Sequence, residues 1–117
     1  MNPFPEYHEL ISLFAQEPEL SDADVPWFYN TLTFRGQCQS ASYLVRISPA
    51  YGELELHITH PDHTSVLLSL AQVRGLTLHE SQTEALIMAT FAADTPCGLL
   101  KFRLRPHLQI EWPFEKR

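Results

Sequence analysis

The chain has 117 residues, a hydrophobic share of 44% and a formal net charge of −6. This length fits a single domain, which we expect to span residues 1–117 and to fold without a metal ion or a disulfide. The acidic balance argues against a nucleic-acid binder, because such a protein needs lysines and arginines that displace counterions from phosphates. The charge is also uneven, since no lysine or arginine precedes Arg35, while six acidic residues lie in that opening stretch: Glu6, Glu9, Glu17, Glu19, Asp22 and Asp24.

Residues 5–16 show the pattern of an amphipathic helix. Their apolar side chains recur at the spacing of one face of a helical period: Tyr7, Leu10, Ile11 and Phe14. Pro5 suits the first helical turn, and Pro18 ends the helix because a residue before proline avoids the α region. We expect an acidic loop over residues 17–26, between this helix and the rest of the chain.

From residue 27 to residue 112 the pattern changes to the two-residue alternation of half-buried strands. Strand-like runs cover residues 27–34, 43–48, 53–60, 64–70, 76–78, 84–92, 99–105 and 107–112. The run 84–92 suits a short helix or a buried strand, and its position between strands and before a turn favours a strand. The sequence therefore predicts an α+β fold, in which an N-terminal helix precedes an antiparallel sheet (meander, sandwich or partial barrel) of about six to eight strands.

The start of the chain lacks the basic and apolar segments of a secretion signal, and no apolar run reaches the roughly 20 residues that cross a bilayer. We therefore expect a cytoplasmic protein. Cys38 and Cys97 stand alone in the sequence, without the paired spacing of a metal or redox motif. In a cytoplasmic protein they are most simply small buried apolar residues, and a disulfide between them is the alternative.

Three histidines and a carboxylate fall within residues 57–63: His57, His60, Asp62 and His63. Such a set can supply zinc ligands, and its last three members match the end of the HxHxDH motif of metallo-β-lactamase-like hydrolases. His57 departs from that motif, because it precedes His60 by three residues and so faces the opposite side of a regular strand. We predict a polar strand end and turn, with no cofactor and no metal site. For the alternative, the ligand candidates are His60, Asp62 and His63.

No motif in the sequence predicts catalysis. Glu53 and Glu55 project from one strand face as paired carboxylates do in hydrolases, but carboxylates in such a position are more often solvent-facing. A GxSxG nucleophile motif is absent, and the glycines that a phosphate-binding loop needs in clusters occur singly. The sequence therefore predicts a protein that is not an enzyme.

Residues 27–29 place three aromatic side chains, Trp27, Phe28 and Tyr29, directly after the acidic loop. Tryptophan and tyrosine are enriched at interface hot spots, and neighbouring acids attract a basic partner. Packing of Trp27 and Phe28 into the core is the alternative interpretation. The segment favours a protein that works by binding another protein.

The strands ELELHI, SVLLSLAQVRGLTLHE and LLKFRLRPHLQIEW follow an acidic N-terminal segment. Over residues 43–112 this series resembles small immunity proteins of bacterial polymorphic-toxin and interbacterial-competition systems. The resemblance implies stoichiometric binding to a cognate toxin, often a basic nuclease, whose active site is blocked by acidic side chains. The implied charge carriers are Glu17, Glu19, Asp22, Asp24, Glu53 and Glu55, and the aromatic residues Trp27 and Tyr29 complete the predicted partner-binding set.

Two other functional classes stay open on the sequence alone. A secretion or effector chaperone is also small, acidic and α+β, and it binds an extended client segment along a sheet edge or a hydrophobic groove. A small zinc-dependent enzyme would be built around the histidine cluster of residues 57–63.

Overall fold

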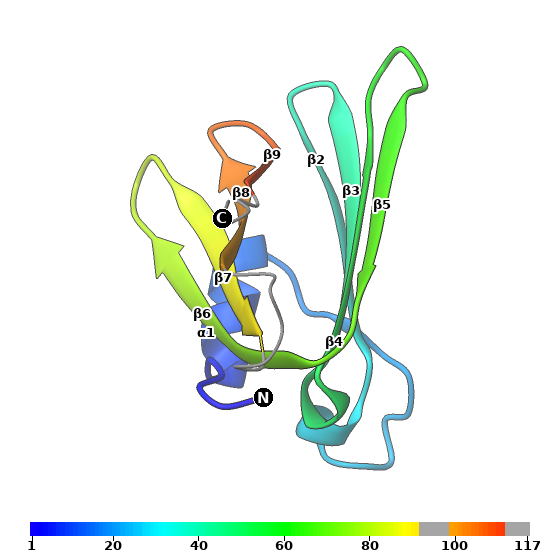
Figure 1. Ribbon diagram of the computed structural model, residues 1–117, viewed down its shortest axis with the longest axis vertical. Coiled ribbons are helices and arrows are strands. Elements are labelled where there is room, and N and C mark those ends of the chain that lie inside the picture. The colour runs from blue at the N-terminus through cyan, green and yellow to red at the C-terminus, as the bar shows by residue number, and fades with distance from the viewer. Residues whose placement is uncertain (92–98, 112–117) are drawn as a thin grey trace, which may run out of the picture.

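The computed structural model describes residues 1–91 and 99–111, which form one helix, nine strands and two short 3-10 turns. In chain order these are α1 (Tyr7–Phe14), β1 (Glu19–Leu20), η1 (Trp27–Tyr29), β2 (Leu32–Cys38), β3 (Ala41–Ser48), η2 (Pro49–Tyr51), β4 (Glu53–Thr59), β5 (Ser65–Leu70), β6 (Val73–Glu80), β7 (Ala85–Phe91), β8 (Leu99–Arg105) and β9 (Gln109–Glu111). The strands make two antiparallel sheets, with the orders β1–β2–β3–β4–β5 and β6–β7–β8–β9 (Figure 1). The predicted α+β class, with a helix before antiparallel strands, is confirmed.

The helix and both sheets share one hydrophobic core. In Figure 1 the two sheets stand next to each other, and the chain crosses from one to the other between β5 and β6. The buried side chains alternate along the strands as the sequence predicts, with Leu54, Leu56 and Ile58 on β4 and Leu100, Phe102 and Leu104 on β8. Because the side chains between them are polar, each strand has one face toward the core and one toward water.

Two further segments resolve as strands. The run 84–92 contains β7, so the strand interpretation is confirmed for Ala85–Phe91. The predicted acidic loop 17–26 contains β1, which pairs with β2 and raises the count to nine strands in the described residues, above the expected number. The turn expected after the run 84–92, together with Cys97 and Trp112, lies outside the described residues.

The helix is shorter at both ends than the predicted range 5–16. Glu6 is its N-cap, so Pro5 lies before the first helical turn, and the helix ends at Phe14 because Ala15 takes the left-handed conformation with φ of 56°. Gln16 therefore leaves the helix, and its side-chain amide bonds both backbone groups of Arg35 on β2, at 2.5 Å (Nε2 to O) and 3.2 Å (N to Oε1). The buried helix residues are Leu10, Leu13 and Phe14, whereas the predicted Tyr7 and Ile11 are half-buried. None of the helices in the described residues has the length and apolar character needed to cross a membrane.

An aromatic chain joins the helix to both sheets. Phe14 of α1 stacks on Phe34 of β2, with ring centroids 4.0 Å apart and an interplanar angle of 13°. Tyr43 of β3 lies 6.1 Å from the Phe14 ring and meets Phe102 of β8 edge-on at 6.5 Å. Gly36 is the cross-strand partner of Tyr43, and a Cβ at this position would lie 2.5 Å from the Tyr43 hydroxyl oxygen. Only glycine therefore lets the Tyr43 ring cross β2.

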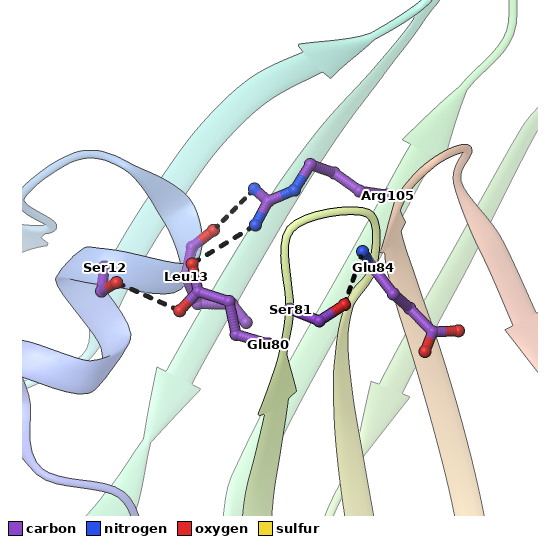
Figure 2. A network of polar contacts seen from close by, with 6 residues as sticks. All are labelled: Ser12, Leu13, Glu80, Ser81, Glu84 and Arg105. Atoms are coloured by element: carbon purple, nitrogen blue, oxygen red, sulfur yellow. Dashed lines mark hydrogen bonds and ion pairs between the residues drawn. The ribbon is translucent and has the colours of Figure 1, made fainter.

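Polar contacts fix the C-terminal end of the helix on the four-stranded sheet (Figure 2). Arg105 of β8 donates from Nη1 to the Leu13 carbonyl and from Nη2 to Glu80 Oε2, both at 3.3 Å. The other Glu80 oxygen accepts a hydrogen bond from the Ser12 hydroxyl at 3.0 Å. The guanidinium thus lies at the negative end of the helix, which is electrostatically favourable. Burial raises the pKa of the Tyr43 hydroxyl, and the nearby Arg105 charge opposes that rise.

The segment 27–34 is not one strand, so this part of the sequence-based prediction is wrong. Its first three residues form the turn η1, and β2 begins only at Leu32. Packing explains the difference, because the ring centroid of Trp27 lies 5.9 Å from that of Phe4 and 5.1 Å from that of Tyr7. The aromatic run closes over the N-terminal segment instead of alternating between two sheet faces.

Replacing Phe34 by alanine tests the junction of helix and sheets. Phe34 is 0% exposed and stacks on the helix, so we expect its loss to lower the free energy of unfolding by about 3–5 kcal/mol. Urea denaturation followed by circular dichroism measures this change. Leu44→Ala, at a half-exposed position on the outer face of β3, is the control and should cost about 1 kcal/mol or less. Equal costs for the two variants would contradict the assigned core.

Candidate partner-binding surface

The acidic loop at residues 21–26 is held in place by the side chain of Asn30. Its Oδ1 accepts a hydrogen bond from the backbone N–H of Asp22 at 2.6 Å. Its Nδ2 donates to the carbonyls of Val25 at 3.3 Å and Pro26 at 3.1 Å. Asn30 is 0% exposed, so these bonds satisfy an amide that has no contact with water. The shape of the loop therefore depends on this one buried residue.

A second set of hydrogen bonds ties the loop to η2. The Thr31 N–H donates to the Ser21 hydroxyl at 2.9 Å, and the Thr31 and Ser48 hydroxyls share a hydrogen bond of 2.9 Å. Ser48 directly precedes η2, and the turns η1 and η2 contact each other. In Figure 1 both turns lie at the lower end of the five-stranded sheet. Segments from residues 21–31 and 48–52 thus form one surface.

Three large apolar side chains are exposed at this end of the molecule: Val25 at 38%, Tyr29 at 58% and Tyr51 at 67%. Trp27, which the sequence groups with Tyr29 as an interface residue, is half-buried and packs against the N-terminal segment. The other exposed large apolar side chains in the described part of the chain lie on β5. Exposed tyrosines are typical of interface anchors, because the ring is apolar and the hydroxyl bonds with water or a partner.

The predicted charge carriers divide into paired and unpaired carboxylates. Glu19 bonds to Arg35 at 3.2 Å and Glu55 bonds to Arg46 at 3.1 Å, so a basic partner would compete with these arginines. Within residues 1–91 and 99–111, no ion pair involves the other four predicted carboxylates, which are Glu17, Asp22, Asp24 and Glu53. An unpaired carboxylate keeps its attraction for a distant cation, and a paired one loses most of it.

We call the surface formed by Asp22, Asp24, Val25, Tyr29, Tyr51 and Glu53 the acidic end. Within it, the Asp24 N–H donates to Asp22 Oδ1 at 3.0 Å, which orders the two aspartates relative to each other. Glu53 begins β4 directly after Gly52, whose left-handed conformation (φ 66°) ends η2. The acidic end combines exposed aromatic rings with carboxylates that form no ion pair in the described chain. Of the predicted set, Glu17, Glu19, Glu55 and Trp27 lie outside it.

The histidine-rich turn after β4 is stabilised by its own aspartate. The Asp62 Oδ1 accepts hydrogen bonds from the Thr64 hydroxyl at 2.6 Å and from the Thr64 N–H at 3.0 Å. The hydroxyl hydrogen bond is the main cause that lowers the pKa of the exposed Asp62 carboxyl. In the described residues no three His, Cys, Asp or Glu side chains are grouped so that they can hold a metal ion. The ligand candidates His60, Asp62 and His63 are therefore not brought into one site.

The sequence does not predict two residues of the acidic end, Val25 and Tyr51, or the buried Asn30 that holds the loop as site residues. Asn30 follows an aromatic run and precedes a strand, and asparagine in such a place is typical of a turn held by side-chain hydrogen bonds. Tyr51 is the last residue of the turn η2, between the predicted strand runs 43–48 and 53–60. The exposure of its ring depends on the contact between η1 and η2, which no local pattern reveals.

Comparisons with known proteins support a shared fold. No family model and no curated protein matches the chain. Among solved structures, it is similar to a chain of the contact-dependent growth inhibition toxin–immunity protein complex from Klebsiella pneumoniae 342, with a TM-score of 0.75 and 17% sequence identity. The similarity covers 94% of this chain and 94% of that chain. The two chains therefore share a fold, and the neighbour comes from the kind of interbacterial system that the sequence resembles.

Replacing Asn30 by alanine tests its role in the loop. The change leaves the Asp22 N–H and two loop carbonyls without their partner, so we expect a loss of about 2–3 kcal/mol in the free energy of unfolding. Amide hydrogen exchange should show faster exchange at Asp22. Gln37→Ala, at an exposed position on β2, is the control and should change neither quantity. Unchanged protection of Asp22 in Asn30→Ala would contradict this role.

Replacing Thr64 by valine should raise the pKa of Asp62 toward its ordinary value of 3.8, because the hydroxyl donor is lost. Titration of the Asp62 carboxyl followed by NMR measures this. Because the pKa of Asp62 is lower in the folded protein than in the unfolded chain, the ionised carboxylate stabilises the fold at pH values above the unfolded-state pKa. This stabilisation is lost as the pH falls through the folded-state pKa. The stability advantage of the wild type over Thr64→Val should therefore shrink on acidification. Thr64→Ser keeps the hydroxyl and should behave as the wild type, and equal Asp62 pKa values in all three proteins would contradict the assignment.

Proposed function

We propose that this protein binds a protein toxin of an interbacterial growth-inhibition system and neutralises it by binding, without catalysis. The observation that carries the proposal is the fold, which over 94% of the chain is similar to a chain of a toxin–immunity protein complex. Such a complex contains two kinds of chain. The net charge of −6 and the acidic end favour the immunity role, since an inhibitor acts by presenting a surface complementary to its target.

The acidic end is the surface through which we expect the toxin to bind. Tyr29 and Tyr51 would serve as anchors, because an aromatic ring buries a large apolar area while few rotatable bonds are fixed. Asp22, Asp24 and Glu53 would attract a basic toxin and increase the rate of association. A surface that covers the active site of a toxin acts in a one-to-one complex. The proposal includes a cytoplasmic location, where toxin and immunity protein meet inside the protected cell.

The proposal is tested by affinity capture of the tagged protein from its native cells, with each captured protein identified by mass spectrometry and then expressed in a laboratory host. We expect one captured protein to arrest growth when expressed alone and to be harmless when expressed with this protein. In calorimetry with that toxin, Tyr29→Ala/Tyr51→Ala should weaken binding about tenfold or more. Asp22→Asn/Asp24→Asn should mainly slow association and reduce its dependence on salt.

Matched controls separate this surface from a general loss of apolar area or charge. Leu67→Ala removes a side chain that is 56% exposed, close to the 58% of Tyr29, and Glu111→Gln removes an exposed carboxylate from β9. Neither change should alter affinity for the toxin. If no captured protein arrests growth, the neutralising role is wrong. If the tyrosine variant binds with full affinity, the role survives but the acidic end is not the binding surface.

A further inference from the structure

Most sheet edges in the described chain are short or covered. β1 has two residues and carries Glu19, and β9 has three residues and carries Glu111. The edge of β6 is covered by the N-terminal segment, because the Asn2 N–H bonds to the Arg74 carbonyl and the Leu76 N–H to the Pro3 carbonyl, each at 2.8 Å. In the part of β2 that does not pair with β1, the side chain of Gln16 bonds both backbone groups of Arg35. Such coverings prevent an edge strand from pairing with another chain.

Within residues 1–91 and 99–111, the edge strand β5 has none of these protections. It is six residues long, pairs with β4 on one side only, and lies at the outer margin of the five-stranded sheet (Figure 1). No charged residue occurs from Thr64 to Val73. Two apolar side chains of the strand are exposed, Val66 at 43% and Leu67 at 56%. An uncharged, exposed and apolar edge is a template for strand addition.

The register of β4 and β5 shows which backbone groups point away from the sheet. In an antiparallel pair, alternate residues bond to the neighbouring strand, and the residues between them present their N–H and C=O groups to the other side. The His60 N–H bonds to the Thr64 carbonyl at 2.8 Å where the β4–β5 hairpin closes. Thr64 thus bonds toward β4, and every second residue after it does the same. The residues between them, Ser65, Leu67 and Ser69, therefore present their backbone N–H and C=O groups to the open edge of the sheet.

We propose that β5 pairs with β5 of a second copy of this chain, in antiparallel orientation about a two-fold axis at Leu67. Leu67 then faces Leu67 of the other copy, Val66 faces Leu68, and Ser65 faces Ser69. This register joins the outward backbone groups of Ser65, Leu67 and Ser69 on both copies. It also places inner-face residues opposite inner-face residues, since Val66 and Leu68 lie on the core side of β5 and Leu67 on the other side.

The sequence of the strand favours a second copy over a strand of another protein. Ser65-Val66-Leu67-Leu68-Ser69 is nearly symmetric about Leu67, so antiparallel self-pairing matches serine with serine and aliphatic with aliphatic residues. In this register Asp62, the one charged residue within 62–72, faces the uncharged Gln72 of the other copy. Self-pairing therefore brings no like charges together across the edge, although each chain is acidic. Because a single strand pair is a small interface, we expect a weak dimer whose population depends on concentration.

Sedimentation equilibrium of the purified protein, from low micromolar to millimolar concentration, tests the proposal. We expect a reversible monomer–dimer equilibrium in the wild type. Leu67→Lys places two positive charges opposite each other at the axis and should raise the dimer dissociation constant about tenfold or more. Leu44→Lys makes the same substitution on the same sheet face but on β3, and it should dimerise as the wild type does. A monomer at every concentration, or a dimer that Leu67→Lys does not weaken, would overturn the proposal.

Disulfide trapping tests the register, in a chain with Cys38→Ser and Cys97→Ser. At the axis the two Cα atoms of residue 67 should lie about 5.5 Å apart, within the range that a disulfide spans. Leu67→Cys should therefore form a covalent dimer under oxidation, and Ser65→Cys alone should not. Ser65→Cys combined with Ser69→Cys should crosslink again. A covalent dimer of Ser65→Cys alone that forms as readily as that of Leu67→Cys would contradict the two-fold pairing at Leu67.

Both measurements use the isolated protein and no toxin, so their outcome is independent of the proposed neutralising function. The alternative is that β5 pairs with an extended strand of another protein, such as a chaperone's client. In that case the isolated protein would stay monomeric even at millimolar concentration. That result would overturn the self-pairing without bearing on the acidic end.

Discussion

The stack of Phe14 on Phe34 is the contact on which the rest of the arrangement depends, because it joins the helix to the five-stranded sheet. Tyr43 continues the contact to Phe102, and so to the four-stranded sheet. When the helix packs in this position, it also fixes the positions of the chain segments that precede and follow it. The residues before it reach the edge of β6, and Gln16 after it reaches the edge of β2. The helix therefore closes the core, and the residues that flank it cover two sheet edges.

The sequence predicts well those parts of the fold in which burial follows a simple alternation. β4 and β8 are confirmed because their inward residues are apolar and their outward residues are polar. The prediction fails at residues 27–34, where aromatic side chains mimic a strand and instead pack against the N-terminal segment. The position of Asn30 could not be predicted either, since the loop atoms that its side chain bonds are defined only by the folded chain.

The charges of the candidate site are likewise only partly predictable from the sequence. Charge patterning finds the acidic residues as a group, but their effect on a partner depends on which of them are already neutralised. Arg46 faces Glu55 because of the register between β3 and β4, and Arg35 reaches Glu19 because β1 adds to β2. Both facts follow from strand pairing and not from composition. The carboxylates of the acidic end keep their electric field toward solvent, because none of the strand pairs in the described residues places an arginine opposite them.

The two candidate binding surfaces, the acidic end and the β5 edge, have different chemistry and lie on different parts of the five-stranded sheet. The acidic end combines carboxylates with tyrosines, which suits a charged partner approached from a distance. The β5 edge has no charge and offers backbone groups in a nearly symmetric sequence, which suits a partner of the same kind. Because β5 lies along the margin of the sheet and the turns η1 and η2 lie at its lower end, pairing centred on Leu67 would leave the η1 and η2 part of the acidic end uncovered (Figure 1). Glu53 is the member of the acidic end that borders β5, at Ser69 and Leu70. Two copies joined in this way would present two separate acidic ends, so self-association through β5 and partner binding through the acidic end are compatible in one molecule.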